Sequence, residues 1–118
     1  MPRSHPPAAD LVDAVRELLE REVVGRLEGD LAFQCRVAAN ALGIVSRELR
    51  LGGALDAAER QRLAALLGRE GTLEELANEL ARRIRSGALA PDDPTLLASL
   101  RASVADALRV NNPKWLGD

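Results

Sequence analysis

The apolar residues of this chain recur every three to four positions, and this spacing limits what it can fold into. Such a period places them on one side of an α-helix, whereas a half-buried strand would alternate apolar and polar residues. No stretch of the 118 residues alternates in that way. Aromatic residues make up only 2% of the chain, so the core has to be built from Leu, Ala and Val. We therefore expect an all-α fold, a compact bundle of about five helices joined by short turns.

Glycine and capping residues divide the chain into these helices. The expected helices cover residues of about 8–27, 31–50, 56–67, 72–87 and 94–111. Gly52 and Gly53 are expected to end the second helix, and Gly68 the third, because glycine favours the conformation that closes a helix. Thr72 and Glu75 form an S/T-x-x-E capping box at the start of the fourth.

The expected helices belong to one domain, residues 10–112. Residues 1–9 and 113–118 are expected to be tails, the first of them flexible and Pro-rich, and Trp115 either packs on the bundle or meets a partner. One stripe of each helix is assigned to the core. In the first and last helices these stripes are Leu11, Val15, Leu18 and Leu19, and Leu96, Leu97, Leu100, Val104 and Leu108.

The second helix is apolar on two sides. Its core stripe is predicted to consist of Leu31, Cys35, Ala38, Leu42, Val45 and Leu49. Nearly opposite lies a second ridge of Phe33, Val37, Ala41 and Ile44. A surface helix of a monomer would not normally carry such a ridge. Either the chain covers this helix on both sides, or the ridge contacts another protein.

A polar strip lies between the two apolar sides. It contains Arg36, Asn40, Gly43 and Arg47, whose spacings of four, three and four place them on one side of the helix. Two guanidinium groups and an amide are suited to a carboxylate, a phosphate or an acidic side chain of a partner. The alternative interpretation is that the arginines are solvated and pair with glutamates of their own chain.

Several kinds of chemistry have no support in the sequence. His5 is the only histidine and lies in the Pro-rich start, while Cys35 falls on the predicted core stripe. No His or Cys pair has metal-ligand spacing, and no glycine-rich nucleotide motif is present. We expect no catalytic residues, no metal and no cofactor, and therefore not an enzyme on its own.

Charge and hydropathy restrict the expected partners and location. The formal net charge of -2 provides no basic field for nucleic acid, and no apolar run approaches the length of a membrane span. We expect no binding to nucleic acid or membrane, and a cytoplasmic location. A lone cysteine is consistent with a reducing compartment.

Residues 11–49, LVDAVRELLEREVVGRLEGDLAFQCRVAANALGIVSREL, resemble a bacterial family of short all-helical proteins of unknown function. The DDP before the last helix and the terminal NNPKWL add to this resemblance, and LAFxxRVAANALxIVxREL is its most specific part. Members of that family are encoded beside a kinase of the aminoglycoside-phosphotransferase type and an acyl-CoA dehydrogenase. Gln34 stands where members often have a histidine, so this position does not predict proton chemistry.

The resemblance implies an accessory subunit that assists such a kinase in phosphorylating the hydroxyl of a 4-hydroxyacyl-CoA. On this hypothesis Phe33, Val37 and Ile44 are apolar anchors, and Arg36, Asn40 and Arg47 bind at the rim or on an anionic group. One alternative is a stand-alone bundle that binds an acyl-CoA or another anionic acyl ligand. Another is a homodimer through the Phe33 ridge, which is compatible with a kinase partner.

Overall fold

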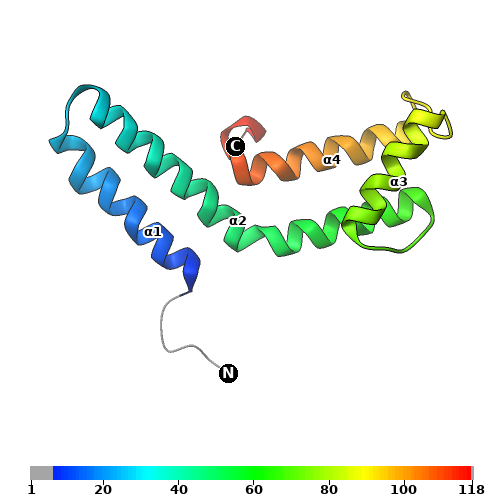
Figure 1. The fold of residues 1–118 in the computed structure, drawn as a ribbon, viewed down its shortest axis with the longest axis horizontal. Helices are drawn as coiled ribbons and strands as arrows, with labels where there is room; N and C mark the ends of the chain where they lie inside the picture. The colour runs from blue at the N-terminus through cyan, green and yellow to red at the C-terminus, as the bar shows by residue number, and fades with distance from the viewer. Residues whose placement is uncertain (1–6, 118) are drawn as a thin grey trace. The chain divides into compact units, whose positions relative to one another are not determined.

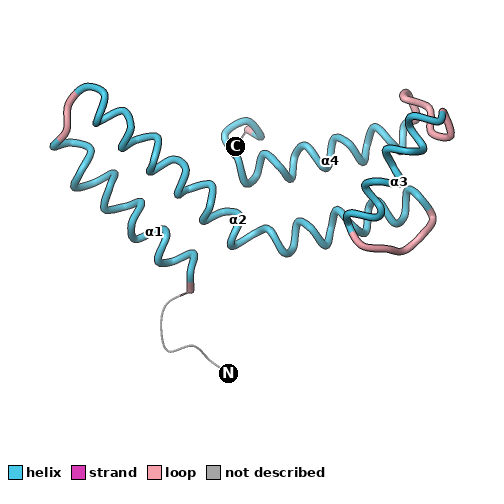
Figure 2. Tube along the Cα trace, in the orientation of Figure 1, coloured by secondary structure: helices cyan, strands magenta, loops and turns pink. Residues whose placement is uncertain are grey.

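A computed structural model describes residues 7–117, and every regular element in that range is helical (Figures 1 and 2). The α-helices are α1 (Ala8–Leu18), α2 (Gly29–Leu67), α3 (Leu73–Ser86) and α4 (Pro94–Asn111). A π-helical segment (Leu19–Val23) and a 3-10 turn (Val24–Arg26) prolong α1, and a second 3-10 turn (Pro113–Leu116) follows α4. The all-α expectation is confirmed. The expected number of helices is corrected from about five to four in the described range.

The difference in number comes from Gly52 and Gly53, which do not end a helix. Both lie within α2, and neither has the positive φ of a helix-closing glycine. Glycine in a helix interior costs about 1 kcal/mol relative to alanine, which weakens a helix without breaking it. The predicted ends at Gly68 and Gly87 are confirmed, with φ of 68° and 83°.

The chain forms two compact units. Unit 1 extends to Gly52 and includes Val110–Asn112, and unit 2 comprises Gly53–Arg109 and Pro113–Asp118. A single domain over residues 10–112 stays a prediction. Of the predicted N-terminal tail, residues 1–6 lie outside the described part of the chain, and α1 already begins at Ala8.

Unit 1 is an antiparallel pair made of α1 and the first part of α2 (Figure 1). The pair is packed along small residues, and those that are buried are Ala9, Ala32, Cys35, Ala39, Gly43 and Ser46. Of the predicted core stripe of this helix, Cys35 is buried and Leu42 is half-buried, but the assignment is wrong for Leu31, Val45 and Leu49, which are about half exposed. Leu11, Val15 and Leu18 of α1 are also about half exposed, against expectation.

The contact line in unit 1 is rotated from the predicted one for a physical reason. Small side chains on α2 allow the α1 backbone to approach, and Arg50 binds two carboxylates of α1. Its Nη2 lies 2.9 Å from Oδ1 of Asp10 and 2.7 Å from Oδ2 of Asp13. These exposed bonds lie beside the line of small residues, and Leu31, Val45 and Leu49 of α2 stay about half exposed.

Unit 2 contains a core of large side chains. Leu63, Leu67 and Leu76 are buried together, and Ala64, Leu73, Leu80 and Leu89 pack around them. The predicted capping box is present: the Glu75 backbone N–H donates to Oγ1 of Thr72 at 3.1 Å, and the Thr72 N–H donates to Oε1 of Glu75 at 2.8 Å. Local capping and the leucine stripe together fix the position of α3.

Helix α4 also faces a different way than predicted. Leu96 is buried as expected, but Val104 is 60% exposed. Polar bonds to α2 hold the opposite side of α4: Arg62 Nη2 donates to Oδ2 of Asp106 at 2.8 Å, and the Ser103 hydroxyl donates to the Glu59 carboxylate at 2.7 Å. The inward-facing assignment of Val104 and of Leu100, which is 39% exposed, is therefore wrong.

Candidate functional site

A polar hollow of about 400 Å³ runs along one edge of unit 1, between α1 and α2. It is lined by Asp13, Arg16, Glu20, Ala39, Asn40, Gly43, Ser46, Arg47 and Arg50. Two predicted site residues, Asn40 and Arg47, thus lie in one hollow. The glycine at position 43 keeps the floor of the hollow low, because it has no side chain.

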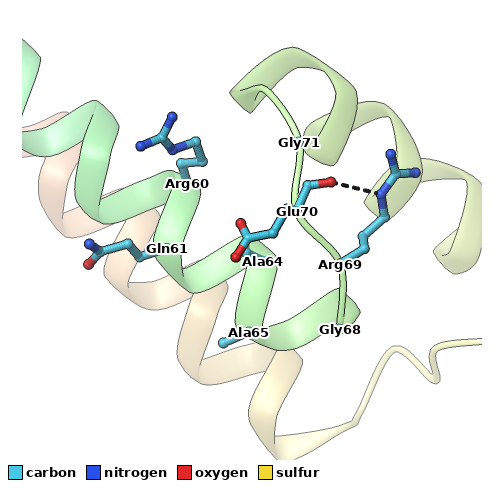
Figure 3. Close-up of a pocket in the computed structure, with 8 residues that line it drawn as sticks. All are labelled: Arg60, Gln61, Ala64, Ala65, Gly68, Arg69, Glu70 and Gly71. Carbon is cyan, nitrogen blue, oxygen red and sulfur yellow. Dashed lines mark hydrogen bonds between the residues drawn. The ribbon is translucent and has the colours of Figure 1, made fainter.

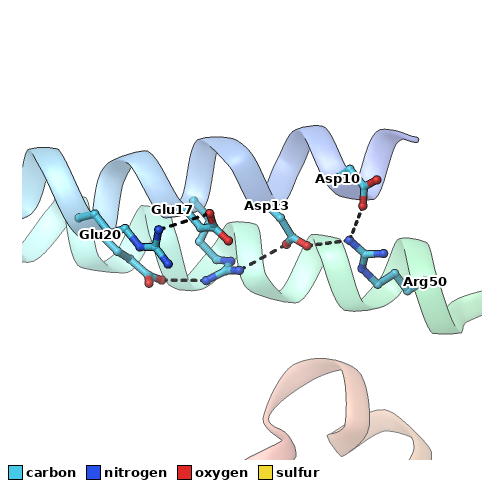
Figure 4. A network of polar contacts seen from close by, with 7 residues as sticks. Asp10, Asp13, Glu17, Glu20 and Arg50 are labelled. Atoms are coloured by element: carbon cyan, nitrogen blue, oxygen red, sulfur yellow. Dashed lines mark hydrogen bonds and ion pairs between the residues drawn. The ribbon is translucent and has the colours of Figure 1, made fainter. Parts of the chain in front are cut away.

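The carboxylates in this hollow are already paired (Figure 4). Asp13 binds Arg50 and lies 3.6 Å from Nη2 of Arg16, and Glu20 lies 3.3 Å from Nη1 of Arg16. Hydrogen bonds from the Ser46 hydroxyl and from Arg50 lower the pKa of Asp13 below its ordinary value. The two carboxylates of the hollow, Asp13 and Glu20, are therefore paired with Arg16 and Arg50.

Arg47 and Arg36 have no such carboxylate partner. Arg47 is half-buried, and its Nε donates to the backbone carbonyl of Val110 at 2.6 Å. Arg36 is exposed and makes no ion pair or side-chain hydrogen bond with any residue from 7 to 117. Pairing with local glutamates, the alternative interpretation from the sequence, is thus not seen for either arginine within the described range.

The hollow continues into a second one of about 430 Å³, lined by Glu20, Arg36, Val37, Ala39 and Asn40. The two linings together contain four arginines and two acidic residues. Because both carboxylates are paired with Arg16 or Arg50, the excess positive charge belongs to Arg36 and Arg47. This edge is electrostatically suited to an anionic group.

The apolar ridge borders the same edge. Phe33 is 60% exposed and Val37 is 52% exposed, while Ile44 is half-buried. The Phe33 ring does not lie in the interior of its own chain. The six predicted site residues therefore occupy one continuous surface of α2, three of them apolar and three polar.

Sequence reasoning missed the contribution of α1 to this surface. Asp13 and Arg16 line the hollow from α1, and Arg50 extends it on α2. The sequence signal for this pairing was opposite charge: α1 carries the acidic residues Asp10 and Asp13, and α2 carries the basic Arg50. Matching these edges requires knowing which helices pair, and the spacing within one helix does not give that.

Unit 2 has two further hollows. One of about 770 Å³ surrounds the turn after α2, where Arg60 and Arg69 lie on opposite sides and the Glu70 carboxylate points into the space between them (Figure 3). Its charges do not converge on one point. The other, of about 390 Å³, is an apolar groove lined by Leu97, Leu100, Arg101, Val104, Ala105, Leu108 and Leu116.

The residues with possible catalytic or metal chemistry are placed as follows. Cys35 is buried, with Sγ 3.9 Å from the carbonyl oxygen of Leu19 in the π-helical segment. His5 lies outside the described residues. Residues 7–117 contain no group of His, Cys, Asp and Glu arranged to hold a metal ion. Over the same range, none of the helices combines the length and the apolar character that a membrane span requires.

Comparison with known protein families matches residues 25–115 to a domain of unknown function, DUF6285. The chain belongs to the DUF6285 family. The DUF6285 match includes all six predicted site residues on α2 and continues through α3 and α4, whereas α1 lies before it. No curated protein and no solved structure matches the chain.

Proposed function

We propose that this DUF6285 chain is a non-catalytic accessory subunit that binds a partner protein through the Phe33 and arginine surface of α2. Phe33 and Val37 would enter an apolar depression of the partner, and Arg36 and Arg47 would bind an anionic group. The partner that the sequence resemblance implies is a kinase of the aminoglycoside-phosphotransferase type that acts on a hydroxyacyl-CoA. The chain's role would be to assist that kinase.

One observation carries this proposal: an exposed aromatic ring lies beside an arginine that has no partner among the described residues. Aromatic residues and arginine are enriched where protein interfaces hold most of their binding energy. An aromatic ring that is 60% exposed leaves apolar area in water, and a partner that covers it gains the hydrophobic free energy. The arginines at the edge would orient the partner in the complex and would raise the association rate with an acidic surface.

The experiment mixes the purified kinase with this chain and measures co-elution and the turnover of a 4-hydroxyacyl-CoA. Phe33→Ala and Arg36→Ala should each weaken complex formation about tenfold or more, as is typical of interface anchors. Co-elution should fall further in the double variant. The proposal fails if the wild-type proteins neither co-elute nor alter kinase turnover.

Matched controls come from unit 2. Val104 is 60% exposed on α4, and Arg101 is exposed on the same helix. Like Phe33→Ala and Arg36→Ala, the variants Val104→Ala and Arg101→Ala truncate an exposed apolar residue and an exposed arginine, but at positions outside the proposed surface. If the controls weaken the complex as much as the α2 variants do, the partner binds elsewhere on the chain.

A second candidate function is supported by the apolar groove on α4. The groove is almost entirely aliphatic, and Arg101 is among its lining residues. An apolar channel beside one cation suits a fatty acyl chain that carries an anionic head, as in an acyl-CoA. Calorimetry with acyl-CoAs on the isolated chain tests this, and submicromolar binding that Arg101→Ala weakens would favour it over the accessory role.

A further inference from the structure

Most residues of a heptad-spaced apolar stripe on α2 are exposed, and α1 does not cover them. The stripe consists of Leu31, Cys35, Ala38, Leu42, Val45 and Leu49, at alternate spacings of four and three. That spacing is typical of helices that pack side by side in bundles. Only Cys35 of this stripe is buried. Successive residues of an α-helix are rotated by about 100° around its axis, and on this basis the line covered by α1 lies about 80° around α2 from the stripe.

Helix α1 carries the same pattern. Leu11, Val15 and Leu18 follow at spacings of four and three, and they are 51%, 49% and 54% exposed. Around the axis of α1, these three residues lie on one side of the line that contacts α2, and Asp13 lies on the other side. On α2 the contact line likewise separates the heptad stripe from Arg47. The two stripes therefore lie on one side of the helix pair, opposite the polar hollow, and we call this side the heptad face.

We propose that the heptad face binds the same face of a second copy of this chain, so that two α1–α2 pairs form a four-helix bundle. This inference does not depend on the kinase partner, because it concerns the other side of unit 1. A two-fold axis needs a surface that is complementary to itself, and two parallel aliphatic ridges fulfil that condition. Ridges with this spacing pack into each other at a small crossing angle.

The composition of the face favours a second copy over a different protein. No charged side chain occurs at the stripe positions from Leu11 to Leu18 or from Leu31 to Leu49. Interfaces between permanent identical subunits are more apolar than those with exchanging partners, which keep charged residues. The opposite edge of unit 1 contains arginines, and its composition is therefore that of an interface with an exchanging partner.

The size of the face is sufficient for a dimer. From Leu31 to Leu49 it is roughly 27 Å long, at about 1.5 Å per residue, and two helices make it roughly 20 Å wide. Two such faces would bury on the order of 1,100 Å², above the roughly 1,000 Å² expected of a specific interface. Unit 1 buries mainly small side chains, so this interface would also supply its missing layer of large ones.

Sedimentation equilibrium of the purified chain tests the proposal, with two variants that differ only in the face they alter. Val45 and Val37 are the same residue type on the same helix and are 45% and 52% exposed. Wild type should have twice the mass of the chain. Val45→Glu should raise the dimer dissociation constant by about 100-fold or more, because each dimer would bury two carboxylates. Val37→Glu should leave the mass doubled.

A further variant guards against misfolding. Ala38 is exposed at the middle of the stripe, and Ala38→Lys adds a charge without removing an apolar contact in the monomer. It should be monomeric with an unchanged circular dichroism spectrum. A monomeric wild type overturns the proposal. Dissociation by Val37→Glu instead of Val45→Glu and Ala38→Lys would place the dimer on the Phe33 ridge and overturn it as well.

Discussion

Gly43 is the residue where stability and the proposed binding surface are expected to conflict. A Cβ at this position would lie 3.4 Å from Nη1 of Arg47 and 3.6 Å from Cδ of Arg16, which are ordinary contact distances. Alanine is favoured over glycine in a helix interior by about 1 kcal/mol. Gly43→Ala should therefore raise the free energy of unfolding by up to about 1 kcal/mol.

The same substitution should weaken the partner complex, because the added methyl group fills the floor of the hollow beside the Arg47 guanidinium. Urea denaturation measures the first effect, and a binding titration with the kinase measures the second. Loss of stability would mean that α1 and α2 pack more closely at Gly43 than the structure has it. Greater stability with unchanged binding would exclude the hollow from the interface.

Among the elements, α2 differs most from the sequence pattern, because it continues through the two glycines that were expected to end it. The sign of the stability change caused by Gly53→Ala tests this continuation. A Cβ on Gly53 would meet nothing within 4 Å. If the helix continues through this position, Gly53→Ala should raise the free energy of unfolding by about 0.5–1 kcal/mol. If the residue instead closes a helix in a left-handed conformation, the same change should lower it by about 1 kcal/mol or more. Urea denaturation distinguishes the two outcomes.

What could be predicted from the sequence depends on whether the interaction is local. The start of α3 was predicted correctly because Thr72 and Glu75 bind within one turn. The common surface of Arg36 and Arg47 on α2 was also predicted, since helical spacing alone determines it. The exposure of Val45, which was expected in the core, was not predicted, because it depends on where α1 packs. That position depends on tertiary contacts, the small residues of α2 against α1 with Arg50 bound to Asp10 and Asp13 beside them, which no periodicity reveals.

For the molecule as a whole, ionised carboxylates in both units predict a loss of stability in acid. Hydrogen bonds from Ser46 and Arg50 lower the pKa of Asp13 in unit 1. In unit 2, the Thr72 backbone and hydroxyl lower the pKa of Glu75, and Arg83 and Arg82 lower that of Glu79. In the unfolded chain these groups return to ordinary values of 3.8 for Asp and 4.5 for Glu.

A lowered pKa in the folded state means that the unfolded chain binds more protons at low pH. The stability from these three groups is thus present above the unfolded values and lost as the pH falls below about 4.5 through the folded ones. Urea denaturation at a series of pH values from 7 to 3 should show this fall. Asp13→Asn and Glu79→Gln should each make it shallower.

The matched control for these variants is Glu48→Gln, at an exposed position inside α2 whose carboxylate has no side-chain hydrogen bond or ion pair among residues 7–117. It should leave the slope of stability against pH unchanged, because the substitution removes no hydrogen bond or ion pair of the folded chain. A wild-type slope that Asp13→Asn and Glu79→Gln do not reduce would mean that these bonds are not held in solution. The Arg50 contact with Asp13 would then not contribute to the packing of α1 on α2.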